Sequence, residues 1–277
     1  MKIAIQTSLL PGTDLTERFA NAASFGFDAV ELVVGPVFDL EEHVTDVQRA
    51  MEASGLPVAA ICTHSMHDPL VPKPEERERR FAALSRLVEL AGNLGAGGVV
   101  SVPVRPPHVF PGPGDPPGEP LEVAAVAFDR WVETLKSGPA AIFLEPLNRY
   151  EAKLLNRVEQ AAAICEAVGH PRVRALADLF HMNIEESSMA APIAGAAAHL
   201  GHIHLADNNR LQPGAGCFDF TAPFAALKAI DYDGYLGLEC SLRRGPAPDD
   251  RPEVALPETA RFLREQWERA GSSTPAA

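Results

Sequence analysis

The stretch VRALADLFHMNIEE (residues 173–186) carries the pattern that decides the fold, a short apolar run with an acidic residue at its C-terminal end. Three further stretches repeat this pattern with Glu or His: AIFLEPLNRYE (141–151), GHIHLADNNR (201–210) and GYLGLEC (234–240). The residues in question are Glu145, Asp178, His204 and Glu239. Catalytic side chains of (β/α)₈ barrels gather at the C-terminal ends of the strands. These four residues therefore indicate a barrel whose site is built on its fifth to eighth strands.

Short β-type runs alternate with longer helix-compatible segments eight times along the chain. The expected strands are Ile3–Thr7, Ala29–Val33, Val58–Thr63, Gly98–Val102, Ala141–Glu145, Val173–Asp178, His202–Leu205 and Tyr235–Glu239. This alternation predicts a parallel sheet, and eight repeats favour its closure into a barrel. An open doubly wound sheet is the alternative, but no GxGxxG follows the first strand. We expect a single α/β domain over residues 1–270, a (β/α)₈ TIM barrel.

Two segments interrupt the alternation of strands and helices. Residues 103–120 (PVRPPHVFPGPGDPPGEP) are rich in proline and glycine, which predicts a long loop on the catalytic side of the barrel. Such a loop could cover or wall the site, or be a tolerated surface insertion. Residues 271–277 (GSSTPAA) have no apolar face, so we expect a disordered tail.

The composition excludes several classes of protein. The 277 residues are 46% hydrophobic and 22% charged, as in ordinary globular proteins, and the formal net charge of −13 argues against a nucleic-acid partner. No apolar run approaches the length of a membrane span, and no secretory segment precedes the first strand, so we expect a cytoplasmic protein. The cysteines lack metal-type spacing, which predicts free, buried thiols at Cys62, Cys165, Cys217 and Cys240.

The four strand-end residues suit a divalent cation. Each carboxylate alone could be a helix N-cap or an ion-pair partner, but together they would bury unpaired charge at a severe cost, which a metal ion relieves. A structural zinc would prefer cysteine and histidine ligands in a closed tetrahedron. Three carboxylates with one imidazole favour one Mn²⁺, with Mg²⁺ or Co²⁺ as alternatives, and leave positions open for substrate oxygens.

The spacing of Glu145 and Glu239 suggests a reaction. The fifth and eighth strands of an eight-strand barrel are roughly 135° apart around the ring, so the two carboxylates can approach a substrate from different sides. One could remove a proton next to a metal-polarised carbonyl while the other returns a proton to the opposite face. This arrangement predicts epimerisation or aldose–ketose isomerisation of a sugar.

Several motifs resemble those of the D-tagatose/D-psicose/L-ribulose 3-epimerases in the xylose isomerase-like TIM barrel superfamily. Residues Asp178–Glu186 are similar to their D-x-F-H-M-N-I-E-E segment, and Glu145–Glu151 to their E-x-x-N-R-(F/Y)-E segment. His204 with Asn209–Gly214 resembles their H…N-R-x-x-P-G stretch. The resemblance extends over most of the chain but is specific only between Glu145 and Glu239.

The resemblance implies a role for each matched residue. The implied metal ligands are Glu145, Asp178, His204 and Glu239. Glu145 and Glu239 would be the acid/base pair at C3 of a ketose. Glu151 would bind the sugar near O1 and O2, while His181 and Arg210 would hold the oxygen at C2. Structural alternatives are a helix-entry role for Glu151, support of Asp178 by His181, and an ion pair for Arg210. Relatives of this kind commonly form homodimers or homotetramers.

The N-terminal half departs from the best-known ketose 3-epimerases, whose early loops supply aromatic walls. His64, His67, Arg105 and His108 could form a more polar wall instead, for a phosphate, a carboxylate or a differently hydroxylated sugar. We expect His64 to bind substrate, with buried scaffolding as the alternative. The identity of the sugar is therefore left open by the sequence.

Other functions on the same scaffold compete with epimerisation. An inosose or 3-dehydroshikimate dehydratase also begins with proton removal beside a metal-bound ketone, and hydroxypyruvate isomerase uses related chemistry. Endonuclease IV shares the fold, but it holds three zinc ions through additional His and Asp ligands. Here Asn208, Asn209 and Arg210 follow His204 without a nearby Asp-x-His. A barrel that binds sugar without turning it over is the remaining alternative.

Overall fold

The computed structural model describes residues 1–112, 115–243 and 250–270 and forms a closed barrel of parallel strands in the order β1 to β8. The strands are β1 (Lys2–Gln6), β2 (Ala29–Val34), β3 (Val58–Thr63), β4 (Gly98–Ser101), β5 (Ala141–Leu144), β6 (Val173–Asp178), β7 (Leu200–Leu205) and β8 (Tyr235–Leu238). Each lies within two residues of the bounds that the sequence predicts. The predicted (β/α)₈ TIM barrel is therefore confirmed.

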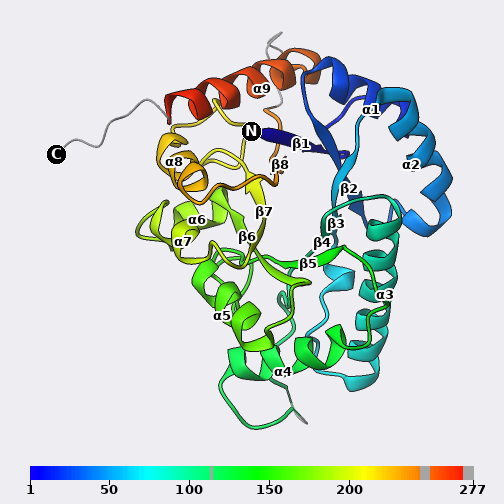
Figure 1. The fold of residues 1–277 in the computed structure, drawn as a ribbon, viewed down its shortest axis with the longest axis vertical. Helices are drawn as coiled ribbons and strands as arrows, with labels where there is room; N and C mark the ends of the chain where they lie inside the picture. Colours follow the sequence, from blue (N-terminus) through cyan, green and yellow to red (C-terminus); the bar gives the residue numbers. More distant parts are fainter. Residues whose placement is uncertain (113–114, 244–249, 271–277) are drawn as a thin grey trace.

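Helices surround the barrel on its outside (Figure 1). They are α1 (Leu15–Ser24), α2 (Leu40–Ser54), α3 (Pro74–Asn93), α4 (Pro120–Val132), α5 (Val158–Val168), α6 (Leu179–Glu185), α7 (Ala191–Gly195), α8 (Thr221–Ala229) and α9 (Pro252–Arg269). A short 3₁₀ turn, η1 (Ser65–His67), follows β3. The last helix lies beside the end of the first, where Arg264 donates a hydrogen bond to the Gly26 carbonyl at 2.8 Å.

Alternation along the strands separates an outer from an inner core. Ile3 and Ile5 of β1 belong to the large apolar cluster between barrel and helices, while Ala4 packs with Ala29 and Ala59. Successive strand residues point to opposite faces, so Ala4 faces the barrel interior. Pairing of β1 with β8, for example Ile3 with Leu236, closes the ring.

The loop after β4 is fixed to the beginning of α3. The Leu70 amide donates to the Pro103 carbonyl at 2.9 Å. Arg77 donates to the Val71 carbonyl and forms an ion pair with Asp115. The contacts of Pro103 and Asp115 hold the described part of residues 103–120 against α3 and the segment before it, and its predicted role as a wall of the site stays a prediction.

Two expectations about the chain have different outcomes. Cys62 and Cys165 are buried free thiols, but Cys217 is exposed and Cys240 is half-buried, so the prediction of burial is wrong for these two. Cys217 lies in a turn where its sulfur accepts from the Asn208 side chain, outside the barrel core.

The predicted tail, residues 271–277, lies outside the described residues. Within the described residues, no helix has the length and apolarity that crossing a membrane requires.

Candidate metal centre and its surroundings

Four side chains from consecutive strands meet at one rim of the barrel. Glu145 directly follows β5, Asp178 ends β6, His204 lies in β7 and Glu239 directly follows β8. One ligand atom from each lies within 4.8 Å of the others. The Nδ1 atom of His204 lies 3.0 Å from Glu145 Oε1 and 3.2 Å from Glu239 Oε2. The structure thus brings together all four residues that the sequence predicts as metal ligands.

The strand ends place these side chains. The Glu145 amide donates to the Ser101 carbonyl and the Glu239 amide to the Leu205 carbonyl, both at 3.1 Å, so the sheet ladder continues one residue past each strand. β6 runs directly into α6, and Asp178 caps this helix by accepting from the Phe180 amide at 2.8 Å. Because parallel strands end at the same rim, residues far apart in sequence converge there.

The cluster is nearly inaccessible to solvent and strongly charged. Asp178 and His204 are buried, and the Glu239 side chain retains 20% exposure. Burial alone would raise the pKa of Glu239, but His204 and Arg210 hold it well below its ordinary value. Burial would likewise raise the pKa of Asp178, and Arg210 lowers it. Asp178 and Glu239 are therefore ionised, and their oxygens are available as hard ligands for a cation.

Arg210 bridges two members of the cluster. Its Nη1 lies 2.7 Å from Asp178 Oδ2, its Nη2 lies 2.8 Å from Glu239 Oε2, and its guanidinium lies 4.6 Å from the centre of the Phe180 ring. Its backbone is left-handed, with φ of 62°, an uncommon conformation for a residue other than glycine. From this position the side chain reaches Asp178 at the end of β6 and Glu239 just after β8. Arg210 thus forms the ion pair that was the structural alternative, and its role in binding substrate stays a prediction.

His181 and Glu151 lie on one hydrogen-bonded path that leads from the cluster to the surface. The backbone amide of Asn148 donates to His181 Nδ1 at 3.1 Å, so the neutral ring carries its proton on Nε2. That Nε2 lies 3.4 Å from Asp178 Oδ2. The Asn148 side chain donates to Glu151 Oε1 at 2.8 Å, and Glu151 itself is exposed. His181 therefore lies between Asp178 and Asn148, and Glu151 lies at the exposed end of this path.

His64 does not join the cluster. It is exposed and follows β3, so the alternative of buried scaffolding is wrong. Its side chain lines a cavity of about 720 Å³ together with Thr7 and Ser8, which follow β1, and with residues 33–38, which begin in β2. This cavity therefore lies at the same barrel rim, beside the early strands.

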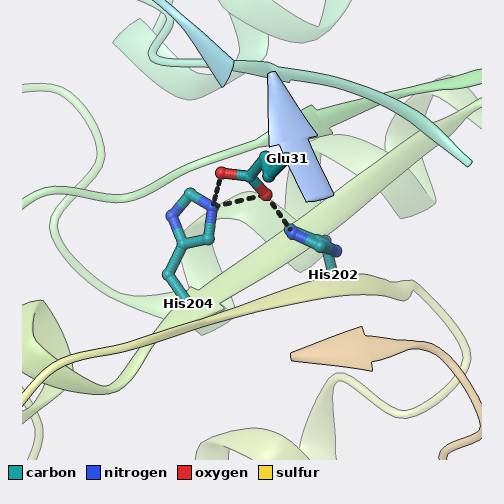
Figure 2. A group of neighbouring side chains, drawn as sticks. All are labelled: Glu31, His202 and His204. Carbon is teal, nitrogen blue, oxygen red and sulfur yellow. Dashed lines mark hydrogen bonds and ion pairs between the residues drawn. The ribbon is translucent and has the colours of Figure 1, made fainter. Parts of the chain in front are cut away.

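Two residues not identified from the sequence complete the surroundings of His204. Glu31 of β2 and His202 of β7 are buried, and Glu31 contacts both histidines (Figure 2). Burial would raise the pKa of Glu31, but the two histidines hold it well below its ordinary value. The signal in the sequence was an ionisable residue inside an otherwise apolar strand, Ala29–Val34.

The donor set fits a divalent cation, and its charge predicts proton release on binding. Burial would lower the pKa of His204, but the carboxylates of Glu31, Glu239 and Glu145 raise it well above its ordinary value of 6.5. The ring of the metal-free protein is therefore doubly protonated at neutral pH. Ligation requires a neutral imidazole, so each bound ion should release about one proton between pH 7 and 8. Mn²⁺ titration calorimetry in two buffers of different ionisation enthalpy measures this number, and equal heats in both buffers would contradict it.

Comparisons with known proteins agree with this architecture. The sequence profile described as xylose isomerase-like TIM barrel matches residues 19–266. The 3-dehydro-D-guloside 4-epimerase of Escherichia coli (strain K12) is 30% identical over 266 residues, which cover 92% of this chain and 98% of the relative. The ketose 3-epimerase of Arthrobacter globiformis is 32% identical over 230 residues, covering 81% of this chain and 76% of that protein.

A solved structure extends the similarity to three dimensions. The apo crystal structure of 3-keto-D-glucoside 4-epimerase from E. coli matches with a TM-score of 0.80 and 28% sequence identity, covering 96% of this chain and 99% of that one. The relatives named here are epimerases of sugars. Because the family profile spans most of the barrel and one relative matches nearly end to end, this chain belongs to the xylose isomerase-like TIM barrel family.

Proposed function

We propose that this protein is a divalent-metal-dependent epimerase or isomerase of a ketose or a related hydroxy-ketone sugar. The observation that carries the proposal is the position of Glu145 and Glu239, which come from strands three apart in the barrel and both contact Nδ1 of the buried His204 ring. The sugar epimerases that resemble this chain over most of its length support the same reaction class.

Glu145 and Glu239 would exchange protons with the two faces of the substrate. One carboxylate removes the proton from the carbon next to the carbonyl, and the other delivers a proton to the opposite face of that carbon. The configuration inverts because the two groups come from different strands. Glu145 is almost fully buried, while Glu239 keeps partial exposure, so Glu239 has the shorter path to bulk solvent.

Glu145, Asp178, His204 and Glu239 would hold the ion, and the hard oxygens favour Mn²⁺, with Mg²⁺ or Co²⁺ as alternatives. The bound ion would stabilise the negative charge of the enediolate. Arg210 and His181 lie within hydrogen-bond reach of the same carboxylate, Asp178, and would donate to sugar oxygens beside it. Glu151, exposed at the end of the Asn148 contact, would accept from sugar hydroxyls.

A second candidate substrate is a 3-keto-glycoside inverted at C4. The relative that matches 98% of its own length acts on a dehydro-guloside, and the cavity beside the early strands offers space for the group attached to such a sugar. His64 lines this cavity and would contact that group. In both candidates the inverted carbon neighbours the ketone, at C3 of a 2-ketose or C4 of a 3-keto sugar, so the same two carboxylates serve either.

Incubation in D₂O with Mn²⁺ tests the proposal and separates the substrates. One panel contains ketopentoses and ketohexoses, and the other contains 3-keto-glycosides with aglycones of increasing size. We expect an epimer that carries deuterium at the inverted carbon from one of the panels. Enone absorbance without epimer would indicate a dehydratase instead. Neither product nor deuterium exchange in either panel would refute the proposed function.

A further inference from the structure

Glu31 occupies the centre of a buried hydrogen-bond network at the Nε2 edge of the His204 ring, whereas Glu145 and Glu239 contact its Nδ1 atom. Figure 2 shows Glu31 between His204 and His202. Its Oε2 lies 2.7 Å from His202 Nε2, and its Oε1 lies 3.1 Å from His204 Nε2. The side-chain amide of Gln6 donates from Nε2 to Glu31 Oε1 at 2.9 Å. Glu31 and His204 are fully buried, so these contacts are not screened by water.

Each partner of Glu31 supplies an N–H group. A carboxylate can only accept, so both histidines must carry a proton on Nε2 to make these contacts. For His204, a proton on Nε2 leaves Nδ1 as the atom that can bind a cation. Nδ1 is the atom that lies 3.0 Å from Glu145 and 3.2 Å from Glu239.

We propose that Glu31 is a positioning residue that fixes the tautomer and orientation of His204, so that Nδ1 points at the metal centre. The inference rests on the metal site of the proposed function. His202 and Gln6 hold the carboxylate in place from two other directions, and the His202 ring is itself stacked on Phe143 at 5.3 Å between centroids. A hydrogen-bonded partner behind a ligating histidine typically contributes 10- to 100-fold to metal affinity.

The close packing around Glu31 also explains a glycine in β8. Gly237 pairs with His204 across β7 and β8. A Cβ atom at this position would lie 2.9 Å from Glu31 Oε2 and 3.1 Å from His202 Nε2. The network therefore requires a residue without a side chain there.

A second metal ion held by Glu31, His202 and His204 is the alternative interpretation, because their ligand atoms also lie close together. Three N–H donors already occupy the Glu31 oxygens at hydrogen-bond distances, one of them from Gln6, which has no role as a cation ligand here. An ion would have to displace all three. The geometry thus favours a relay of hydrogen bonds and predicts one Mn²⁺ per chain.

The Glu31→Gln substitution tests this role with little change in shape. Its amide has one acceptor oxygen, and its NH₂ group would face the N–H of one histidine, so His204 loses its tautomeric preference. We expect Mn²⁺ to bind 10- to 100-fold more weakly, measured from the electron paramagnetic resonance signal of unbound ion. The visible absorption bands of bound Co²⁺ should also shift. Asp28→Asn is the matched control, since Asp28 precedes the same strand and pairs with Arg264, away from the metal site.

Every outcome decides between the interpretations. A folded Glu31→Gln protein with wild-type Mn²⁺ affinity and an unchanged Co²⁺ spectrum would overturn the proposal, as would two Mn²⁺ per wild-type chain. If this variant does not fold, His202→Gln removes one anchor of Glu31 and should weaken Mn²⁺ binding severalfold; unchanged binding would overturn the proposal. A wild-type protein that binds no divalent ion would instead refute the proposed function, and the role of Glu31 with it.

Discussion

Glu145→Gln and Glu239→Gln are each expected to lower epimerisation by about 1,000-fold or more, the upper part of the range for loss of a general acid or base. Both residues also belong to the cluster that would hold the ion, so weaker Mn²⁺ binding adds to the loss. The informative measurement is exchange of substrate hydrogen with D₂O, followed separately from each epimer. Each variant keeps one proton-transferring carboxylate, so each should exchange only the epimer whose hydrogen faces that group.

The reciprocal pattern is what distinguishes two bases from one. If Glu145→Gln exchanges one epimer and Glu239→Gln exchanges the other, the carboxylates act on opposite faces. Both variants must be assayed at saturating Mn²⁺, with bound metal measured directly. Glu89→Gln is a suitable control because Glu89 pairs with Lys136 on the surface. Loss of exchange from both epimers in one variant only would indicate a single base, and would contradict the proposed mechanism.

The barrel and the four-residue cluster were predictable because both depend on local patterns. An apolar run that ends in Glu, Asp or His signals a strand end, and parallel strands necessarily end at one rim. Glu145, Asp178 and Glu239 therefore converge once the strands are placed. Errors in the strand bounds of one or two residues do not matter to this argument, because the ladder extends through Glu145 and Glu239 in the structure.

The contacts around the cluster were not predictable in the same way. Glu31 lies in β2 and contacts His204 of β7 across the barrel interior, although the two residues are 173 positions apart in the sequence. No local pattern encodes such a pairing. A carboxylate inside an apolar strand indicates only that a hydrogen-bonding or charged partner must lie near it. The position of the Arg210 side chain was not predictable either, because its backbone is left-handed and no glycine in the sequence signals that conformation there.

The substrate is the least predictable part, for a physical reason. The proposed proton-transfer groups lie at strand ends, whose positions follow from the fold. The proposed contacts that select the sugar lie in loops after β1, β2 and β3, where His64 is exposed and no strand fixes it. Cavity shape there arises from side chains of several loops together, and their packing is not a property of any one segment.

Asp178→Asn is expected to abolish activity and to remove the stabilisation that Mn²⁺ confers on the wild-type protein. Asp178 has two roles that this substitution separates. Its Oδ1 caps α6 through the Phe180 amide, and asparagine is an equally good helix cap. Its Oδ2 contacts Arg210 at 2.7 Å, and an amide NH₂ in that place would face a donor and carry no charge for a cation. The metal site should therefore fail while the helix start persists.

Thermal unfolding with and without Mn²⁺ measures the two roles separately. An ion present at one hundred times its Kd stabilises the folded wild-type protein by about 2.7 kcal/mol, and the variant should gain almost none of this at the same concentration. Asp39→Asn is the matched control, because Asp39 caps α2 by accepting from the Glu41 amide at 2.9 Å, outside the metal cluster. This control should keep the full Mn²⁺ response. A wild-type response in Asp178→Asn would mean that the ion binds elsewhere, and that the three carboxylates gather around Arg210 and His204 for stability alone.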